Sequence, residues 1–494
     1  MSAAAGKLGP GKAMLEARSG PGAFRKTSHL HFVGIGGTGM CGIAEVLLNM
    51  GFRVTGSDLK RTPVTERLEM LGGRVAEGHR ARNVHGADVV VVSTAVKREN
   101  VEVVEARRLA IPVIPRAEML AELMRMKYGV AVAGSHGKTS TTSMVAHVLA
   151  EHGFDPTVVI GGRLGSLDSH ARLGQGELMV AEADESDGSF LHLSPTIAVV
   201  TNIDLEHLDH YGSMDRLRDA FADFLNKVPF YGAAVICLDD PEIQALMPRL
   251  HRRLLTYGTS TQADLSVSGI EMRGFGSRCD VTWKGSRLGS VTLAVPGRHS
   301  IQNSLAALAV AMELDIPFEE AAGRLSTFGG ADRRFQLRGT MDGDIMVVDD
   351  YAHHPTEIRA TLTAAKEGWD RRIIAIFQPH RYSRLQALME EFATSFYEAD
   401  VVIVTPVYPA GEDPIPGVDA ETIRGRIVEH GHRDVRLVES LDEALALVRG
   451  MAGRNDIVLT MGAGDVNRIC RALVEGHDDT SPKPAVRPRK RKGR

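Results

Sequence analysis

The chain has 494 residues, 43% hydrophobic and 24% charged, which is enough for about two to four domains with cores of their own. It contains no run of about 18 apolar residues, and residues 1–26 lack the apolar stretch of a secretory signal, so the composition argues against a membrane-spanning or secreted protein. The net charge of −4 combines two basic ends with a body near −15, and an acidic body argues against nucleic acid as a partner.

Both ends of the chain are expected to lie outside the folded domains. Residues 1–26 carry five basic residues and one acidic residue, and residues 482–494 carry seven basic residues and none acidic. We predict a disordered extension at 1–27 and a basic disordered tail at 473–494. The four cysteines have no metal-ligand spacing, which is typical of a reduced, cytoplasmic protein.

The first ordered segment has the pattern of a nucleotide-binding half-domain. An expected strand runs into GIGGTG, with Gly34, Gly36 and Gly39 in the order G-x-G-x-x-G, and an expected helix follows. A second expected strand at 53–56 runs into Ser57 and Asp58. Asp58 stands where a Rossmann unit places its ribose-binding acid. A third expected strand, at 88–92, ends at Ser93. A dehydrogenase is the default interpretation of this segment, which we end near residue 127.

The stretch GSHGKTSTT, residues 134–142, is predicted to bind a nucleotide phosphate. It lies between an expected strand at 128–133 and an expected helix at 141–152, so backbone amides would face the phosphate at the helix N-terminus. Lys138 would reach the outer phosphates, and Thr139 would bind Mg²⁺. Val132 replaces the first glycine of the strict P-loop pattern. The alternative is a chance Gly-Lys-Thr in a surface turn, and a dehydrogenase does not explain this loop.

Two further expected strands end in acidic residues. The strand at 178–181 runs into EADESD, which begins at Glu182, and the strand at 196–200 runs into TNIDLEHLD, which contains Glu206 and His207. Ligands of open α/β sheets lie at the carboxyl ends of strands, so these acids should converge on the phosphate loop and could hold Mg²⁺. His207 is either a metal ligand or a helix-capping residue, and its acidic neighbours favour the ligand.

The second domain is expected to end near residue 330, after a small β excursion at about 258–292. Asn303 precedes an expected helix at 304–313, where it is either a site residue or a helix-start residue. Arg333 and Arg334 follow the domain. They either clamp phosphate oxygens or are two solvated charges.

A third domain is predicted to repeat the plan, with strands at 345–348, 373–377, 401–404 and 456–460 that end in polar clusters. Arg381 and Arg384 are suited to holding a small carboxylate. For His353 and His354, catalysis and packing are both open.

Nine stretches, in order along about residues 28–472, resemble those of the Mur ligase family. They are HFVGIGGTGMCGIAEVLLNMG, GSHGKTSTT, EADESDGSFLHLSP, VTNIDLEHLDHYG, RRFQ, DDYAHHPTEI, FQPHRYSR, TPVYPAGE and MGAGD. Their joint specificity is far above that of any single motif.

The resemblance implies an α/β fold of three domains. These are a Rossmann-like UDP-sugar-binding domain at 28–127, a central P-loop ATP-binding domain at 128–330, and a Rossmann-like amino-acid-binding domain at 331–472. It also implies a cytoplasmic enzyme of peptidoglycan precursor synthesis that uses ATP and two Mg²⁺ ions. The substrates would be UDP-N-acetylmuramic acid and L-alanine, joined through an acyl phosphate. We expect a monomer or weak homodimer.

The same resemblance assigns roles to individual residues. The expected catalytic residues are Lys138, His207, His380, Arg381 and Arg384. The expected ATP-binding residues are Gly134, Ser135, His136, Gly137, Lys138, Thr139, Ser140, Asn303 and Arg334. The expected sugar-nucleotide-binding residues are Gly36, Gly37, Thr38, Gly39, Met40, Asp58 and Ser93. The expected metal ligands are Thr139, Glu182 and His207.

Some features depart from the family pattern or leave alternatives open. Ser135 replaces a usual threonine, Ala352 a usual glycine and Ser300 a common asparagine, and residues 209–226 contain no lysine for the modification found in relatives that add later amino acids. A ligase of the same family that attaches a preformed peptide in recycling is one alternative, although EADESDGSFLHL better resembles the alanine-adding branch. An NAD-dependent oxidoreductase built on residues 30–94 and a non-catalytic scaffold are the others.

Overall fold

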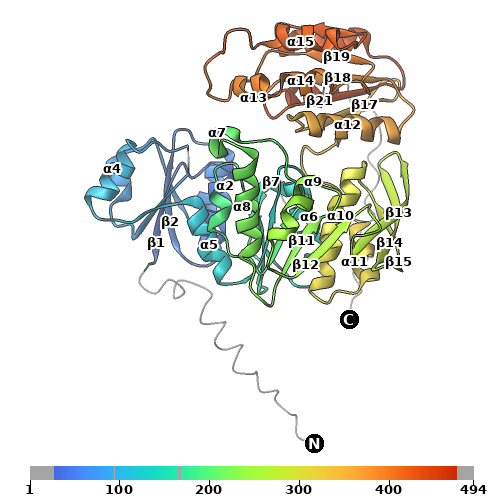
Figure 1. Cartoon of the computed structure of the whole chain (residues 1–494). Coiled ribbons are helices and arrows are strands. Elements are labelled where there is room, and N and C mark those ends of the chain that lie inside the picture. The colour runs from blue at the N-terminus through green and yellow to red at the C-terminus, as the bar shows by residue number, and fades with distance from the viewer. Residues whose placement is uncertain (1–26, 94, 165–168, 476–494) are drawn as a thin grey trace, which may run out of the picture. The chain divides into compact units, whose positions relative to one another are not determined.

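The computed structural model describes residues 27–475, apart from 94 and 165–168. The chain divides into two compact units, Met1–Asp332 and Arg333–Arg494 (Figure 1). Most of the predicted extension and tail lies outside the described residues. The last helix, α17 (Asn467–Glu475), takes in residues 473–475, which the sequence analysis assigned to the tail.

The first unit begins with a parallel sheet of five strands in the order β3-β2-β1-β4-β5. Its elements are β1 (His29–Val33), α2 (Thr38–Asn49), β2 (Arg53–Asp58), α3 (Pro63–Met70), β3 (Arg74–Glu77), η2 (Ala81–Val84), β4 (Val89–Val92), α4 (Val101–Arg108), β5 (Val113–Pro115) and α5 (Arg116–Arg125). The strand order reverses between β1 and β4, and open α/β sheets bind ligands at such a point. This topology confirms the Rossmann-like prediction.

A buried carboxylate, Glu102 at the start of α4, ties the loops of this sheet together. It is 0% exposed and accepts hydrogen bonds from Ser57 Oγ (2.5 Å), Asn83 Nδ2 (2.5 Å) and the Arg80 amide (3.1 Å). Burial favours the neutral acid, but these bonds and one to His31 outweigh it and hold the pKa of Glu102 down to about 2. The charge is therefore satisfied by hydrogen-bond donors of β1, β2 and the segment that follows β3.

The second sheet of the first unit has ten strands in the order β15-β14-β13-β12-β11-β10-β6-β9-β7-β8. Its elements are β6 (Tyr128–Ala133), α6 (Lys138–Glu151), β7 (Thr157–Leu164), β8 (Ser169–Arg172), β9 (Leu178–Glu182), η3 (Ser189–His192), β10 (Ile197–Val200), α7 (Leu208–Tyr211), α8 (Met214–Asn226), β11 (Ala233–Cys237), α9 (Pro241–Leu246), η4 (Met247–Arg249), β12 (Leu254–Gly258), β13 (Leu265–Arg273), β14 (Gly276–Trp283), β15 (Ser286–Leu293), α10 (Arg298–Glu313) and α11 (Phe318–Leu325).

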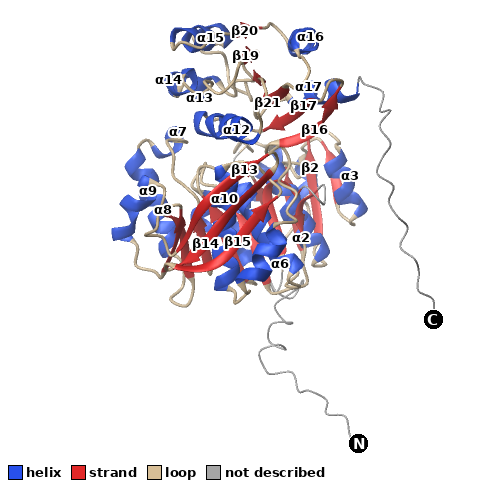
Figure 2. Ribbon diagram, turned by 90° about the vertical axis from the view of Figure 1, so that its right-hand side faces the viewer, coloured by secondary structure: helices blue, strands red, loops and turns tan. Residues whose placement is uncertain are grey.

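The middle of this sheet sets the position of the site. The strands from β12 to β7 are parallel, and β13, β14 and β15 extend one side as an antiparallel meander, the predicted β excursion (Figure 2). Strand β6 lies between β10 and β9 and is almost wholly buried, as expected for a central parallel strand. Because the three strands are neighbours, the segments that follow them meet at one edge of the sheet.

One predicted boundary in this sheet is wrong. The sequence placed a helix at 304–313 with Asn303 before it, whereas α10 begins at Arg298, after Gly297 with φ 93°. Asn303 therefore lies in the second turn of α10, which excludes its interpretation as a helix-start residue. The phosphate-loop helix also begins earlier than expected, at Lys138.

The second unit is built on one sheet of six strands in the order β16-β17-β21-β18-β19-β20, with β16 antiparallel and the others parallel. Its elements are β16 (Gln336–Met341), β17 (Ile345–Asp350), α12 (Pro355–Gly368), β18 (Ile373–Phe377), α13 (Tyr382–Ala387), α14 (Met389–Ala393), β19 (Val401–Val404), α15 (Ala420–Glu429), β20 (Val435–Leu437), α16 (Leu441–Met451), β21 (Ile457–Met461) and α17. The four predicted strands are confirmed.

No helix within the described residues is long and apolar enough to cross a membrane.

We predict that Glu102→Gln destabilises the first unit. The amide replaces an acceptor that satisfies four donors, so we expect the free energy of unfolding at pH 7 to fall by about 2–3 kcal/mol. The folded pKa of about 2 lies below the ordinary 4.5, so the carboxylate stabilises the fold above pH 4.5 and this contribution is lost as the pH falls toward 2. Thermal unfolding of both proteins at pH 7 and pH 4 measures the difference, which should narrow at the lower pH.

The matched control is Glu105→Gln on the same helix, because the partners of Glu105, Arg108 and His85, are 65% and 55% exposed. Its effect should be smaller, since exposed ion pairs contribute little. Equal losses for the two variants would contradict the role of the buried network.

Candidate active site

The loop between β6 and α6 has the backbone of a phosphate-binding turn. Gly134 (φ 131°) and Gly137 (φ 80°) have positive φ, which glycine adopts without strain. A Cβ on Gly134 would lie 2.1 Å from Thr201 Oγ1, so no larger residue fits. Helix α6 begins at Lys138, and its first amides have no carbonyl partner within the helix. The turn can therefore bind an anion at the positive end of the helix dipole.

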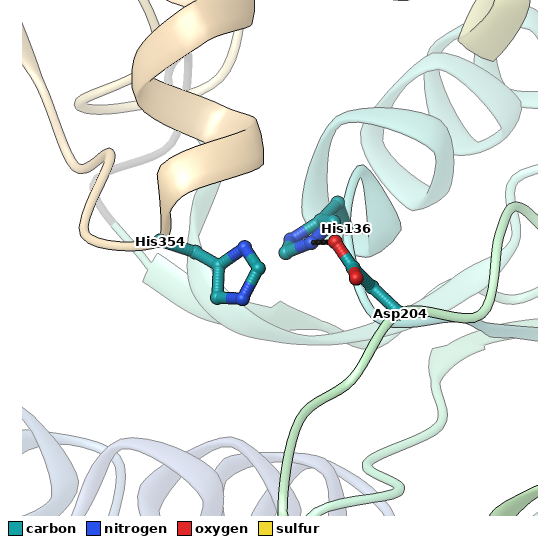
Figure 3. A group of neighbouring side chains, drawn as sticks. All are labelled: His136, Asp204 and His354. Carbon is teal, nitrogen blue, oxygen red and sulfur yellow. Dashed lines mark hydrogen bonds and ion pairs between the residues drawn. The ribbon is translucent and has the colours of Figure 1, made fainter. Parts of the chain in front are cut away.

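The segment that follows β10 holds this loop in place. The amides of Ser135 and His136 donate to the backbone oxygen (3.0 Å) and side-chain oxygen (2.8 Å) of Asn202. His136 Nε2 lies 2.9 Å from Asp204 Oδ2, a contact that Figure 3 shows as a dashed line. The third side chain drawn there, His354, belongs to the second unit. The loop is thus fixed by protein contacts before any ligand binds.

Lys138 is placed among carboxylates. Its ammonium donates to two carbonyl oxygens of the loop, at 2.6 and 3.1 Å, and to Glu185 Oε1 at 2.7 Å. Burial lowers the pKa of Lys138, but the negative charges of Glu185, Glu182 and Glu206 outweigh burial and raise it. The side chain therefore carries a positive charge at neutral pH, as a group that binds phosphate oxygens requires.

A cluster that could hold a cation lies beside Lys138. Ligand atoms of Glu185, Glu206 and His207 all lie within 4.8 Å of one another. Among the described residues none donates a hydrogen bond to Glu185 Oε2, which is buried. Burial raises the pKa of Glu185, although the charge of Lys138 opposes this. Two carboxylates, one of which has an unsatisfied buried oxygen, and an imidazole fit a divalent cation such as Mg²⁺.

The structure divides the predicted metal ligands between two places. Thr139 Oγ1 donates to both oxygens of Glu182, at 3.1 Å each. His207 instead lies 3.7 Å from Glu185 and 3.9 Å from Glu206. The predicted list of ligands omitted Glu185 and Glu206. The two acidic segments were the available signal, but sequence spacing alone does not say which acid of each turns inward.

His207 lies in the turn before α7, and Asn303 lies on α10. His207 has φ 57°, a left-handed conformation that few side chains other than glycine adopt, at the turn that leads into α7. Such strain is found most often at functional sites. Asn303 packs over the phosphate loop: a Cβ on Gly137 would lie 2.7 Å from Asn303 Oδ1. Asn303 thus meets the loop from α10.

The predicted sugar-nucleotide loop spans Gly36 and Gly37, which connect β1 to α2, and Thr38, Gly39 and Met40, which form the first turn of α2. The Gly36 amide donates to Asp58 Oδ2 at 2.8 Å, so the predicted ribose acid also fixes the loop. Ser93 follows β4, which pairs with β1 and brings Ser93 to the same edge. Met40 is 2% exposed and packs in the core, so its side chain is not open to a ligand. The side chain of Thr38 lies outside the described part of the structure.

In the second unit, Arg333 is anchored to the protein. Its Nε donates to Asp349 Oδ2 (3.2 Å) and its Nη2 to the Gly462 carbonyl (2.7 Å). Asp349 is 0% exposed and also accepts hydrogen bonds from Arg338 (3.0 Å) and Thr460 (2.9 Å). Arg333 is therefore no solvated charge, and it links the start of this unit to the MGAGD loop.

Arg334, the arginine expected to contact ATP, has a different partner. Its Nη1 donates to Glu357 Oε1 at 3.2 Å. Nearby, burial raises the pKa of Asp350 to about 6, although the charge of Arg334 opposes this. Asp350 accepts a hydrogen bond from the amide of Ala352 at 2.7 Å. Ala352 is not among the residues with positive φ, so alanine replaces the usual glycine there without backbone strain.

His380, Arg381 and Arg384 lie together after β18. The ring of His380 stacks on Tyr408 with centroids 5.5 Å apart, and the Arg381 amide donates to the Tyr408 carbonyl (2.9 Å). Burial lowers the pKa of His380 to about 3, with the charges of His353, Arg384 and Arg381 adding to it. A neutral imidazole beside two guanidinium groups can bind a carboxylate and accept a hydrogen bond from an amine.

The two histidines of the AHHP motif, His353 and His354, make different contacts. His354 is 3% exposed and caps α12, where its Nδ1 accepts a hydrogen bond from the Thr356 amide (3.3 Å). His353 Nδ1 lies 3.2 Å from Glu357, and its ring meets that of His380 edge to face at 5.8 Å. The capping contact favours packing for His354, whereas His353 lies beside the predicted catalytic residues.

A phosphate loop, a buried lysine and a cluster of cation-type ligands define an α/β enzyme of phosphoryl-transfer chemistry. Three family models match the chain: the Mur ligase family catalytic domain at residues 29–128, the Mur ligase middle domain at 132–311 and the Mur ligase glutamate ligase domain at 333–464. The chain belongs to the Mur ligase family.

Individual relatives agree with this assignment. The UDP-N-acetylmuramate–L-alanine ligase of Syntrophotalea carbinolica is 58% identical over 92% of this chain and 98% of its own. The crystal structure of the UDP-N-acetylmuramate–alanine ligase MurC from Thermotoga maritima has a TM-score of 0.78 and 32% identity, over 92% of this chain and 100% of that one. A murein peptide ligase from Psychrobacter arcticus has a TM-score of 0.67 and 26% identity over the same shares.

We predict that Lys138→Met lowers ADP formation by about 10²–10³-fold, because it removes the buried positive charge of the predicted phosphate loop. ADP release by the purified variant measures this, and circular dichroism shows whether the fold is kept. Lys366→Met, which changes an exposed lysine of α12, is the control and should leave the rate unchanged. Full ADP formation by a folded Lys138→Met protein would contradict the assignment.

Proposed function

We propose that this protein is an ATP-dependent ligase that joins L-alanine to the carboxylate of UDP-N-acetylmuramic acid in peptidoglycan precursor synthesis. The observation that carries the proposal is the 58% identity to an L-alanine ligase over 98% of that relative's length. ATP and a nucleotide-linked sugar acid are cytoplasmic metabolites, so we propose that the enzyme acts in the cytoplasm, as a monomer or weak homodimer.

The proposed reaction has two steps. A carboxylate oxygen of the muramic acid attacks the γ-phosphorus of ATP, and the bond from that phosphorus to the bridging oxygen breaks. ADP departs, and the muramic acid becomes an acyl phosphate. The amine nitrogen of L-alanine then attacks the acyl carbon, loses a proton, and expels inorganic phosphate to leave an amide. Lys138 and the amides at the start of α6 are suited to the first step, because they place positive charge around the transferred phosphate.

Mg²⁺ would be held by the oxygens of Thr139 and Glu182 and by the cluster of Glu185, Glu206 and His207. We propose two ions, because the donors form two groups, Thr139 with Glu182 and Glu185 with Glu206 and His207. Bound Mg²⁺ neutralises charge on phosphate oxygens.

The remaining residues are proposed to bind the two acceptors. The loop at Gly36–Met40 would take the diphosphate of the sugar nucleotide at the reversal point of the first sheet. In the second unit Arg381 and Arg384 would pair with the carboxylate of L-alanine. Neutral His380 would accept a hydrogen bond from its amine.

We expect ADP release from ATP, Mg²⁺ and UDP-N-acetylmuramic acid when L-alanine is added. D-glutamate, a diamino acid and the tripeptide that contains L-Ala-D-Glu should each support little release in parallel reactions. Turnover with the tripeptide in place of L-alanine would move the protein to the recycling branch of the family. No release with any amine would overturn the ligase proposal.

Two bound ions predict a stoichiometry that can be counted. In the presence of a non-hydrolysable ATP analogue, electron paramagnetic resonance should find two Mn²⁺ per chain in the unmodified protein and about one in Glu185→Gln. The matched control is Glu271→Gln, an exposed carboxylate of β13. One ion in the unmodified protein, or two in Glu185→Gln, would contradict the proposed arrangement.

A further inference from the structure

One charged side chain of the first unit connects the predicted sugar-nucleotide loop to the acidic segment. Arg116 is the first residue of α5, and its Nη2 donates to Asp184 Oδ2 at 3.4 Å. Asp184 lies between Glu182 and Glu185 in the EADESD segment. Neither Arg116 nor Asp184 is among the predicted site residues.

The guanidinium of Arg116 lies directly against Gly39. A Cβ built on Gly39 would be 2.4 Å from Arg116 Nη1 and 2.9 Å from its Cζ. Gly39 is not among the glycines with positive φ, so the backbone there does not require glycine. The absence of a side chain at Gly39 therefore gives space to Arg116.

The arginine has donors to spare at this place. A guanidinium carries five N–H donors in a rigid planar fork, and the hydrogen bond to Asp184 uses one of them. The arginine side chain is 23% exposed, so the group is neither fully buried nor freely solvated. Planar forks match pairs of phosphate oxygens, which a single ammonium cannot do.

We propose that Arg116 is a positioning residue that binds the diphosphate of the sugar nucleotide while it holds Asp184. One side of the fork would face the diphosphate above Gly36–Met40, and the other would keep its bond to the acidic segment. Occupancy of the first site would then fix the segment that carries Glu182 and Glu185. This inference rests on the proposed function, because it takes the loop at Gly36–Met40 as a diphosphate site.

The test compares two ligands that differ only in the diphosphate. Dissociation constants of UDP and of uridine are measured by calorimetry for the unmodified chain, Arg116→Gln and Arg116→Lys. Loss of a charge-assisted phosphate contact should weaken UDP binding by roughly 10- to 100-fold in Arg116→Gln and leave uridine within about twofold. Arg116→Lys keeps the positive charge and loses the planar fork. Its affinity for UDP should therefore lie between those of the unmodified chain and of Arg116→Gln.

The matched control is Arg125→Gln, at the other end of the same helix. Arg125 pairs with Glu122 at the surface and is 59% exposed, so its change tests loss of an arginine from α5 alone. UDP affinity should stay unchanged in this variant. An Arg116→Gln protein that binds UDP within about twofold of the unmodified chain would overturn the proposal, as would an equal loss for UDP and uridine.

Gly39→Ala gives a second, independent measurement. The added methyl should displace the guanidinium and weaken UDP binding, and it should have little further effect in an Arg116→Gln background. Additive losses would show that Gly39 acts without Arg116 and would overturn the coupling. A chain that binds UDP through Arg116 yet releases no ADP with any amine would overturn the proposed function alone.

Discussion

Lys138 carries a positive charge in a buried place, and the centre of the first unit is arranged around that charge. An ammonium removed from water must be surrounded by acceptors, and here two loop carbonyls and Glu185 provide them. The acceptors come from different strands: the carbonyls follow β6, and Glu185 follows β9. The charge is therefore stable only if those strands are neighbours, as they are in the sheet.

Each of the three sheets holds a buried acid at its carboxyl edge, and each acid is satisfied in a different way. Glu102 relies on uncharged donors, Glu185 on a lysine, and Asp349 on two arginines and a threonine. In every case at least one partner comes from a segment far away in the chain. These carboxylates fix loops that carry predicted site residues, so a stability contact and a functional arrangement coincide in them.

Sequence reasoning found the features that local pattern determines. The strand, glycine-rich turn and helix around GSHGKTSTT were predictable because a phosphate loop needs those residue types in that order, and the buried strands were predictable from apolar runs that end in polar clusters. The start of α10 was missed because His299 and Ser300 give no apolar signal for a first turn. The different partners of Arg333 and Arg334 could not be predicted from the sequence. Only the tertiary fold places Asp349 beside Arg333 and Glu357 beside Arg334.

The inward-facing acids were missed for a related reason. Within EADESD, each of the four acids is equally suited to a metal by its chemistry. The turn after β9 selects among them, because it places Glu182 beside Thr139 and Glu185 beside Lys138 and His207. A sequence shows which residues are available, and the backbone path decides which of them meet.

The bond between Lys138 and Glu185 also bears on how the enzyme finishes a cycle. Without an internal partner, a buried lysine would be left without a counter-charge when the phosphates of ADP depart. Such a lysine would therefore hold these phosphates strongly. Glu185 is a resident counter-ion, so Lys138 keeps a charged partner when the loop holds no nucleotide. The empty loop therefore needs no phosphate to satisfy its buried ammonium.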